Sequence, residues 1–266
     1  MAEFEAGIFD GVDESDYHAR RFGPAESLSS TEAKRVLAAP ALLRFERTHP
    51  RAPKAQFDLG HVAHALVLGV GLNLYVHDFD SLRTKAARQA VAEARAAGMV
   101  PVSRADHAQM TALADAVLTH PVAGRLLSIG QPEQSCYATD EATGTWMRGR
   151  LDWLTVRAGR PVIVDLKTTT SAAPADFRRS VRQWGYDLQR EWYRCIYESV
   201  TGEEADFIHV VVEKTEPYLV SVVRLGEEHV ERGRRKMRRA LDTYAGCLAS
   251  GQWPGYTTGV LDLDAA

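Results

Sequence analysis

The sequence predicts an α/β protein in which helices flank a mixed β-sheet. Residues 136–139 and 145–153 are short apolar segments on either side of a turn that contains Gly144, a pattern that predicts a β-hairpin. Residues 162–167 predict a third and more apolar strand. Helical patterns precede these strands, and another helix and two more strands follow them. This order is typical of a mixed sheet covered by helices.

The N-terminal part is predicted to become helical after an irregular start. Residues 1–26 are rich in Asp and Glu and predict an irregular acidic arm, whereas residues 27–266 predict a single domain, since no long linker interrupts them. Ser30 or Thr31 is expected to cap the first helix, because a hydroxyl can accept a hydrogen bond from a free backbone N–H of the first turn.

Three more helices are predicted before the strands. The segment from Phe57 to Gly69 has a helical pattern that begins after an Asp and ends at a Gly. Residues 81–97 and 104–118 are alanine-rich helical patterns separated by a Gly and a Pro. We expect them to form a helical layer beside the sheet rather than a separate domain.

The C-terminal half predicts one long helix, a hairpin and a final helix. Apolar residues recur at helical spacing over residues 174–200, which predicts a single amphipathic helix. Residues 207–212 and 218–224 predict two strands joined by a turn, and residues 227–250 predict a basic amphipathic helix.

Composition excludes several classes of protein. The net charge of −3 excludes a generally basic nucleic-acid binder, and no apolar run is long enough to span a membrane. The chain begins without a basic and then apolar signal segment. Its three scattered cysteines fit a reducing compartment, so a cytoplasmic protein is expected, in the host cytoplasm if a phage encodes it.

Two acids and a lysine stand on neighbouring strands. Asp152 is predicted to end the second strand. Asp165 and Lys167 lie two apart at the end of the third strand, so the side chains of these two residues share one face. Two carboxylates can hold Mg²⁺, which lowers the pKa of an attacking water, while the lysine orients or deprotonates that water. The alternative is a turn acid and a solvated lysine, but charges at the end of a buried strand favour function.

Four further polar residues are candidates for the same site. Gln189 and Tyr193 are four apart and lie on one helix face, with a packing role as the alternative. His64 follows Gly60 at the spacing Gly-X-X-X-His, although a lone histidine on an apolar helix face is more often a core residue. Glu133 precedes the first strand and could equally be a solvated surface acid.

Taken in order, these segments resemble the PD-(D/E)XK nuclease superfamily, and within it the phage and prophage exodeoxyribonuclease VIII-type domain (RecE-like, RecB-related). The resemblance covers nearly the whole chain, but Leu151 stands where the superfamily has a proline before the first acid. The segments that carry the resemblance are Ser27 to Lys34, Phe57 to Gly69, Glu133 with the Gly144 turn, Arg150 to Trp153, Asp165 to Thr169, and Gly185-Tyr186 with Gln189 and Tyr193.

The resemblance implies roles for the site residues. Asp152, Asp165 and the backbone carbonyl of Leu166 would bind Mg²⁺, with Mn²⁺ as the alternative metal. His64 would bind the metal or a phosphate, and Glu133 would reach a second metal or its waters. Lys167 would be catalytic, with Gln189 and Tyr193 beside the scissile phosphate or organising the lysine. The cysteine count argues against the four-cysteine iron–sulfur cluster that some RecB-like relatives carry.

It also implies an activity and partners. Such enzymes digest linear double-stranded DNA from its ends, 5′ to 3′, and leave 3′ single strands for a strand-annealing recombinase. A homo-oligomeric ring around DNA is a further hypothesis, and no membrane is involved. Two alternatives stay open: a RecB-like structure-selective endonuclease, and a non-catalytic DNA-binding recombination scaffold.

Because the net charge is slightly negative, any positive DNA-binding surface must be local. Two clusters could follow the phosphate backbone, and the second is equally well explained as a solvated helix face. The first is Arg178, Arg179, Arg182, Arg190 and Arg194, and the second is Arg232, Arg234, Arg235, Lys236, Arg238 and Arg239.

Overall fold

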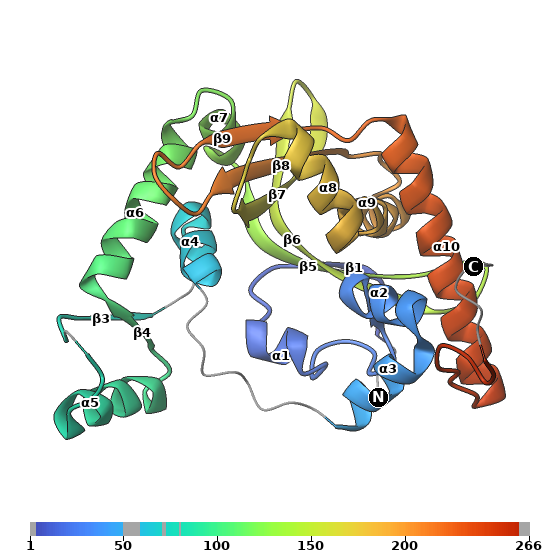
Figure 1. The fold of residues 1–266 in the computed structure, drawn as a ribbon. Coiled ribbons are helices and arrows are strands. Elements are labelled where there is room, and N and C mark those ends of the chain that lie inside the picture. The colour runs from blue at the N-terminus through green and yellow to red at the C-terminus, as the bar shows by residue number, and fades with distance from the viewer. Residues whose placement is uncertain (1–3, 50–58, 71–72, 80, 261–266) are drawn as a thin grey trace.

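A seven-stranded mixed sheet forms the centre of the computed structural model, which describes residues 4–49, 59–70, 73–79 and 81–260 (Figure 1). β7 and β8 are parallel, as are β2 and β6, and the other neighbouring strands are antiparallel. The order of strands is β1 (Gly7–Phe9), β5 (Gln131–Thr139), β6 (Trp146–Arg157), β7 (Arg160–Thr169), β8 (Asp206–Glu213) and β9 (Val220–Val223), with β2 (Leu28–Ser29) beside β6.

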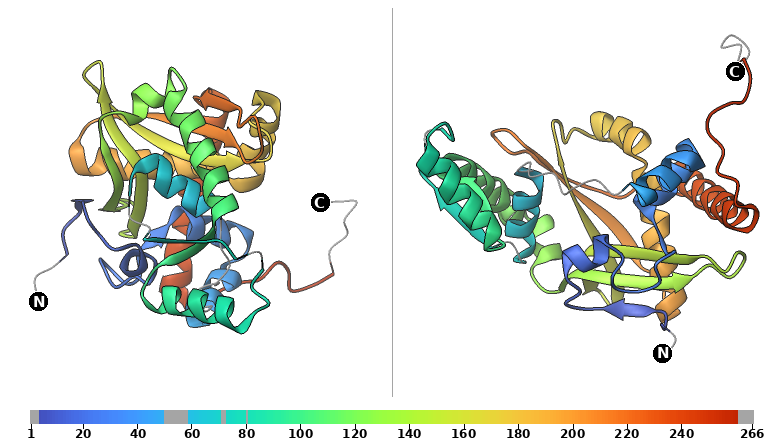
Figure 2. Two further views of the ribbon diagram at one scale, coloured as in Figure 1. Left: turned by 90° about the vertical axis from the view of Figure 1, so that its left-hand side faces the viewer. Right: turned by 90° about the horizontal axis from the view of Figure 1, so that it is seen from below.

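Helices cover both faces of this sheet, as the α/β prediction requires, and the right-hand view of Figure 2 shows α6 and α10 on opposite sides of it. One face packs on α2 (Ser30–Ala38), α3 (Pro40–Thr48), α9 (Tyr186–Thr201) and α10 (Glu227–Ser250). The other packs on α4 (Leu59–Leu68), α6 (Arg104–Thr119) and α7 (Ala123–Leu127). Both apolar clusters use strands of the same sheet, so the sheet holds the two cores together.

The segment between α4 and α6 differs from the prediction. It contains a two-stranded parallel sheet of β3 (Leu74–His77) and β4 (Val100–Ser103), on either side of α5 (Lys85–Ala96). α5 begins at Thr84, whose hydroxyl accepts a hydrogen bond from the backbone N–H of Ala87. Only helices were expected here, because each strand is four residues long and too short to show an alternating pattern. Phe57 and Asp58 of the predicted helix lie outside the described residues.

The N-terminal arm, predicted to be irregular, contains β1 and a short helix, α1 (Glu14–His18). β1 pairs with β5, and aromatic rings of the arm pack around Tyr137 of β5. Backbone carbonyls of Val12 and Tyr17 accept hydrogen bonds from Arg150 and Arg148 of β6. The arm is therefore held in place by its contacts with the sheet. A domain boundary after residue 26 remains a prediction.

The predicted helix over residues 174–200 is two helices, α8 (Pro174–Trp184) and α9. Gly185 separates them with φ 64° and ψ 42°, a left-handed conformation that ends a helix and that glycine adopts without strain. The prediction of one helix was wrong, because the apolar spacing continues across the break. The predictions for β8, β9 and α10 are confirmed.

Ser29, rather than Ser30 or Thr31, caps α2, and Glu32 completes the capping box. The same carboxylate joins three other parts of the chain. Its oxygens lie 2.8 Å from Arg20, 3.0 Å from Arg47 and 3.0 Å from Arg148. Burial works against the charge of Glu32, but Arg47 and Arg148 outweigh it and lower the pKa to about 2.

Glu32→Gln should therefore lower the free energy of unfolding near neutral pH by about 3 kcal/mol, because it leaves buried arginines without their anion. The folded-state pKa lies below the ordinary value of 4.5, so this contribution is present above pH 4.5 and is lost as the pH falls towards 2. Urea denaturation of both proteins at pH 7 and pH 3 measures the difference. An equal difference at the two pH values would contradict the role of the Glu32 charge.

Candidate active site

A cavity of about 1390 Å³ opens between the N-terminal arm, α2, α3, α4 and the strands β5 to β7. Its walls carry acidic and basic side chains in comparable number. The predicted site residues that line it are His64, Glu133, Asp152, Leu166, Lys167 and Tyr193. Asp165 is fully buried next to this wall. Gln189 contacts the wall through its hydrogen bond to Tyr193.

Asp152 lies in the middle of β6 rather than at a strand end. Leu151 packs into the core on one face of the sheet and Trp153 into the core on the other, so the facing pattern of the strand changes at Asp152. Across the ladder, Glu133 has φ 50° and interrupts the pairing of β5 with β6. This local irregularity turns both acids into the cavity. The backbone N–H of Leu166 fixes Asp152 by donating to its Oδ2 at 2.8 Å.

His64 of α4 lies between these two acids. Its Nε2 is 3.0 Å from Oδ2 of Asp152, and its Nδ1 is 3.3 Å from Oε1 of Glu133, which also pairs with Arg150. Burial works against a charged imidazole, but the two carboxylates outweigh it and raise the pKa of His64 to about 10. Burial likewise opposes the charge of Asp152, while His64 and Lys167 lower its pKa. His64 is thus an imidazolium that neutralises the acids.

Asp165 and Lys167 form the second part of the site. Nζ of Lys167 lies 2.6 Å from Oδ2 of Asp165, which makes a close ion pair. Burial raises the pKa of Asp165 to about 6, with Asp152 adding and Lys167 opposing. Burial would lower the pKa of Lys167, but the two acids raise it instead. Lys167 is therefore an ammonium ion at neutral pH.

His209 of β8 lies beside Asp165 in the parallel ladder, where the two residues are paired in register. Its Nε2 is 3.9 Å from Oδ2 of Asp165, and both side chains are fully buried. Within the described part of the chain, neither the ring nitrogens nor the carboxylate oxygens make a hydrogen bond. Burial lowers the pKa of His209 to about 3, so the ring is neutral. Sequence reasoning missed His209, and a single histidine within an apolar strand was its only signal.

The helix motif approaches the site from α9. Nε2 of Gln189 donates to the hydroxyl of Tyr193 at 3.2 Å, and the ring of Tyr193 lies against Gly149 of β6. Burial raises the pKa of Tyr193 well above its ordinary value, so the hydroxyl keeps its proton. Tyr186 also lines the cavity, and Nζ of Lys167 lies 5.0 Å from the centre of its ring.

No group of three or more His, Cys, Asp or Glu among the described residues is arranged to hold a metal ion as it stands. The acids have cationic partners in His64, Lys167 and Arg150. The donor chemistry nevertheless fits a hard divalent cation, because it is dominated by carboxylate oxygens. Oδ1 of Asp165, buried without a hydrogen bond among the described residues, is the oxygen most in need of a ligand.

His64→Ala should destabilise the metal-free protein by about 1–3 kcal/mol at pH 6, because it leaves carboxylates without their cation. The folded-state pKa of about 10 lies above the ordinary 6.5, so the contribution is full below pH 6.5 and is lost as the pH rises through 10. Denaturation in EDTA at pH 6 and pH 10, with the exposed His18→Ala as control, measures this. A larger effect at pH 10 would contradict it.

Comparisons with known proteins agree on the fold. Among solved structures, the chain resembles a candidate exonuclease from Eubacterium rectale with a TM-score of 0.61 and 15% identity, covering 96% of this chain and 97% of the other. A phage-related exonuclease from Haemophilus somnus 129PT matches with a TM-score of only 0.33 and 12% identity, over 71% and 95% of the two chains, which is too low to carry an argument. No curated protein matches the sequence.

The family comparison confirms the predicted superfamily. Residues 35–263 match the family described as the PDDEXK-like domain of unknown function, DUF3799. This match includes the acids of β6 and β7, the lysine, and both residues of the α9 motif. With most of its length matched and with its fold shared by a solved structure, this chain belongs to the PDDEXK-like DUF3799 family and has its nuclease fold.

Proposed function

We propose that this protein is a metal-dependent exodeoxyribonuclease that digests linear double-stranded DNA from its ends, 5′ to 3′, and leaves 3′ single strands for recombination. The observation that carries the nuclease assignment is the buried Asp165–Lys167 ion pair next to Asp152, at the wall of a cavity of about 1390 Å³. A carboxylate that lies within a core, with a lysine beside it and a second acid nearby, is costly for folding and is typical of a catalytic site.

A divalent metal would be held by Asp152, Asp165 and the carbonyl of Leu166, with His64 or Glu133 completing the set. When bound, Mg²⁺ or Mn²⁺ supplies charge that polarises the phosphodiester and lowers the pKa of a water. In the metal-free protein the imidazolium of His64 holds Asp152 and Glu133 in place between α4 and the sheet. It thereby keeps the acids close together before a cation arrives.

Lys167 is an ammonium ion here, so its contribution is that of a positive charge and hydrogen-bond donor. This favours orienting the attacking water or stabilising negative charge on the phosphate, rather than removing a proton. The Tyr186 ring lies against the ammonium group, and Asp165 fixes its direction. The hydroxyl of Tyr193 stays protonated and can donate a hydrogen bond to a phosphate oxygen, while Gln189, one turn earlier in α9, donates a hydrogen bond to that hydroxyl.

End dependence is tested by incubating end-labelled linear duplex and covalently closed circular DNA with the protein, in Mg²⁺ or in EDTA. Asp165→Asn, which keeps the shape of the side chain, serves as the control for a contaminating nuclease. Loss of linear DNA alone, from the 5′ end and only with metal, is the expected result. Equal cutting of the circle would favour the structure-selective endonuclease, and no cutting of either would favour the DNA-binding scaffold.

Lys167→Met should reduce cleavage by at least about 10³-fold while leaving DNA binding in EDTA largely unchanged, because it removes the charge next to the reacting phosphate and keeps the cavity. Lys214→Met changes another lysine of the same cavity and is the matched control. Single-turnover cleavage and fluorescence anisotropy measure the two properties. Wild-type cleavage by Lys167→Met would exclude the lysine from the reaction.

The proposal extends to partners. A homo-oligomeric ring would keep an exonuclease on its DNA, and a strand-annealing recombinase would take up the single strand. Light scattering at working concentration tests the ring, and a solution mass equal to one chain would contradict it. Among the described residues, none of the helices combines the length and hydrophobicity needed to span a bilayer.

A further inference from the structure

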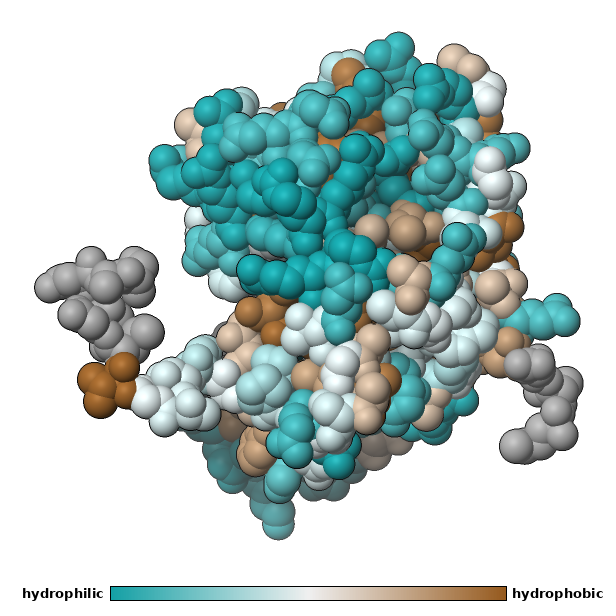
Figure 3. Space-filling model, turned by 90° about the vertical axis from the view of Figure 1, so that its right-hand side faces the viewer, coloured by the Kyte–Doolittle hydropathy of each residue, from teal (hydrophilic) through white to brown (hydrophobic). Residues whose placement is uncertain are grey.

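The structure separates the arginines of the two predicted clusters into two kinds. Several cations of α9 and α10 pair with buried carboxylates: Arg232 and Lys236 with Asp187, and Arg190 and Arg234 with Glu191. The pairs made by Arg232, Arg234 and Lys236 join α10 to α9. The upper half of the face in Figure 3, over the N-terminal part of α10, is mostly hydrophilic, with small hydrophobic patches. This cluster is thus a helix–helix contact with a solvated surface.

The arginines of α8 are different, because they project into solvent. The side chains of Arg179 and Arg182 are 75% and 61% exposed, and Arg178 is exposed as well. Their carboxylate partners, Asp176 and Glu228, are themselves accessible to water, and such exposed ion pairs hold a guanidinium only weakly. The apolar side of α8 packs on β8, so its charged side is the one that remains available.

Two aromatic residues lie along the chain between the arginines of α8 and the active site. Trp184, at the end of α8, is 55% exposed, which is unusual for the largest apolar side chain. Tyr186 follows after Gly185, and its ring lies 5.0 Å from Nζ of Lys167 and 5.8 Å from Nζ of Lys34. Since consecutive Cα atoms are about 3.8 Å apart, the Cα atoms of Trp184 and Tyr186 are at most about 7.6 Å apart.

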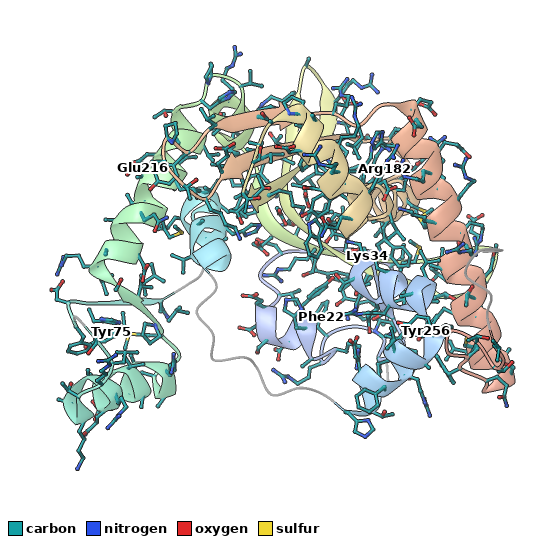
Figure 4. All side chains as sticks on the ribbon, viewed as in Figure 1. Phe22, Lys34, Tyr75, Arg182, Glu216 and Tyr256 are labelled. Carbon is teal, nitrogen blue, oxygen red and sulfur yellow. The ribbon has the colours of Figure 1, made fainter. Side chains whose placement is uncertain are left out.

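Lys34 of α2 is the cation at this junction. Its side chain reaches the Gly185 corner between α8 and α9, where a Cβ on Gly185 would lie 3.2 Å from its Cε, and Figure 4 shows it below the two helices. In the part of the chain that the structure describes, no carboxylate lies within ion-pair distance of its ammonium group. Burial lowers the pKa of Lys34 to about 8, and the charge of Lys167 adds to this effect. A half-buried ammonium group that lacks a carboxylate partner among the described residues favours an anionic ligand.

We propose that Tyr186, Lys34, Trp184 and the exposed arginines of α8 bind single-stranded DNA next to the active site. Cations interleaved with aromatic rings are the surface that unpaired strands prefer, because each base has a free face for stacking and each phosphate needs a counter-charge. A duplex offers no such face except at its end. This inference rests on the proposed nuclease function. A DNA strand that is separated from its partner at the active site would pass Tyr186 first and then Trp184.

Binding is measured by the quenching of tryptophan fluorescence on titration with oligothymidylate, in EDTA so that no strand is cut. Trp184→Leu should weaken binding about tenfold and remove most of the quenching. Two basic variants test the phosphate contacts: Arg178→Gln combined with Arg182→Gln, and Lys34→Gln alone. In each, the slope of the logarithm of the binding constant against the logarithm of the salt concentration should fall in magnitude by about 0.7 per lost phosphate contact.

Two control variants are matched to these changes. Arg235→Gln alters a side chain that is 66% exposed and pairs with Glu231 at 3.4 Å, much as Arg182 pairs with Glu228. Tyr256→Leu removes another exposed aromatic residue, which lies away from Arg182 in Figure 4. Both controls should bind oligothymidylate as the wild type does.

Equal affinity of Trp184→Leu and the wild type for oligothymidylate would overturn the proposal. It would also be overturned if a blunt duplex of the same length bound the wild type equally tightly and the variants lost the same affinity for it. Digestion of linear DNA is judged separately with Asp165→Asn. If the wild type digests DNA with metal and Trp184→Leu binds oligothymidylate normally, only the single-strand site is disproved. If Trp184→Leu binds oligothymidylate more weakly but the wild type does not digest DNA, the nuclease function is disproved and the single-strand site is supported.

Discussion

The burial of Asp165 beside β8 is the constraint on which the rest of the site depends. This carboxylate is fully buried, and no hydrogen bond within the described residues reaches its oxygens. A charge in such a place is tolerated only with a close counter-ion, and Lys167 provides one from two residues along the same strand. α9 then covers the pair with Tyr186, and β8 places the neutral His209 behind it.

The acids of the site are balanced by the protein's own cations. His64 neutralises Asp152 and Glu133, Arg150 shares Glu133, and Lys167 neutralises Asp165. These ion pairs offset the repulsion among the acids in the metal-free protein. A divalent ion has to compete with the imidazolium of His64 for the oxygens of Asp152 and Glu133. Metal binding is therefore expected to release a proton from His64.

Local sequence patterns predicted much of this arrangement. The apolar run before Asp165 identified a buried strand, and period two placed Lys167 on the same face. The spacing of Gln189 and Tyr193 placed both on one helix face, where they now form a hydrogen bond. The break at Gly185 was missed, because the apolar stripe of α8 continues into α9 and a single glycine is tolerated within many helices.

The sequence by itself determined the α/β class, the strands that carry Asp152, Asp165 and Lys167, and the helix that carries Tyr193, because each follows from a repeat of two or of about 3.6 residues within one segment. Only the tertiary structure decided which residues surround them. The parallel register that sets His209 beside Asp165 joins segments far apart in the chain, as do the contacts of His64 with Glu133 and of Lys34 with Gly185. Such pairings depend on packing and long-range hydrogen bonds, which no local repeat encodes.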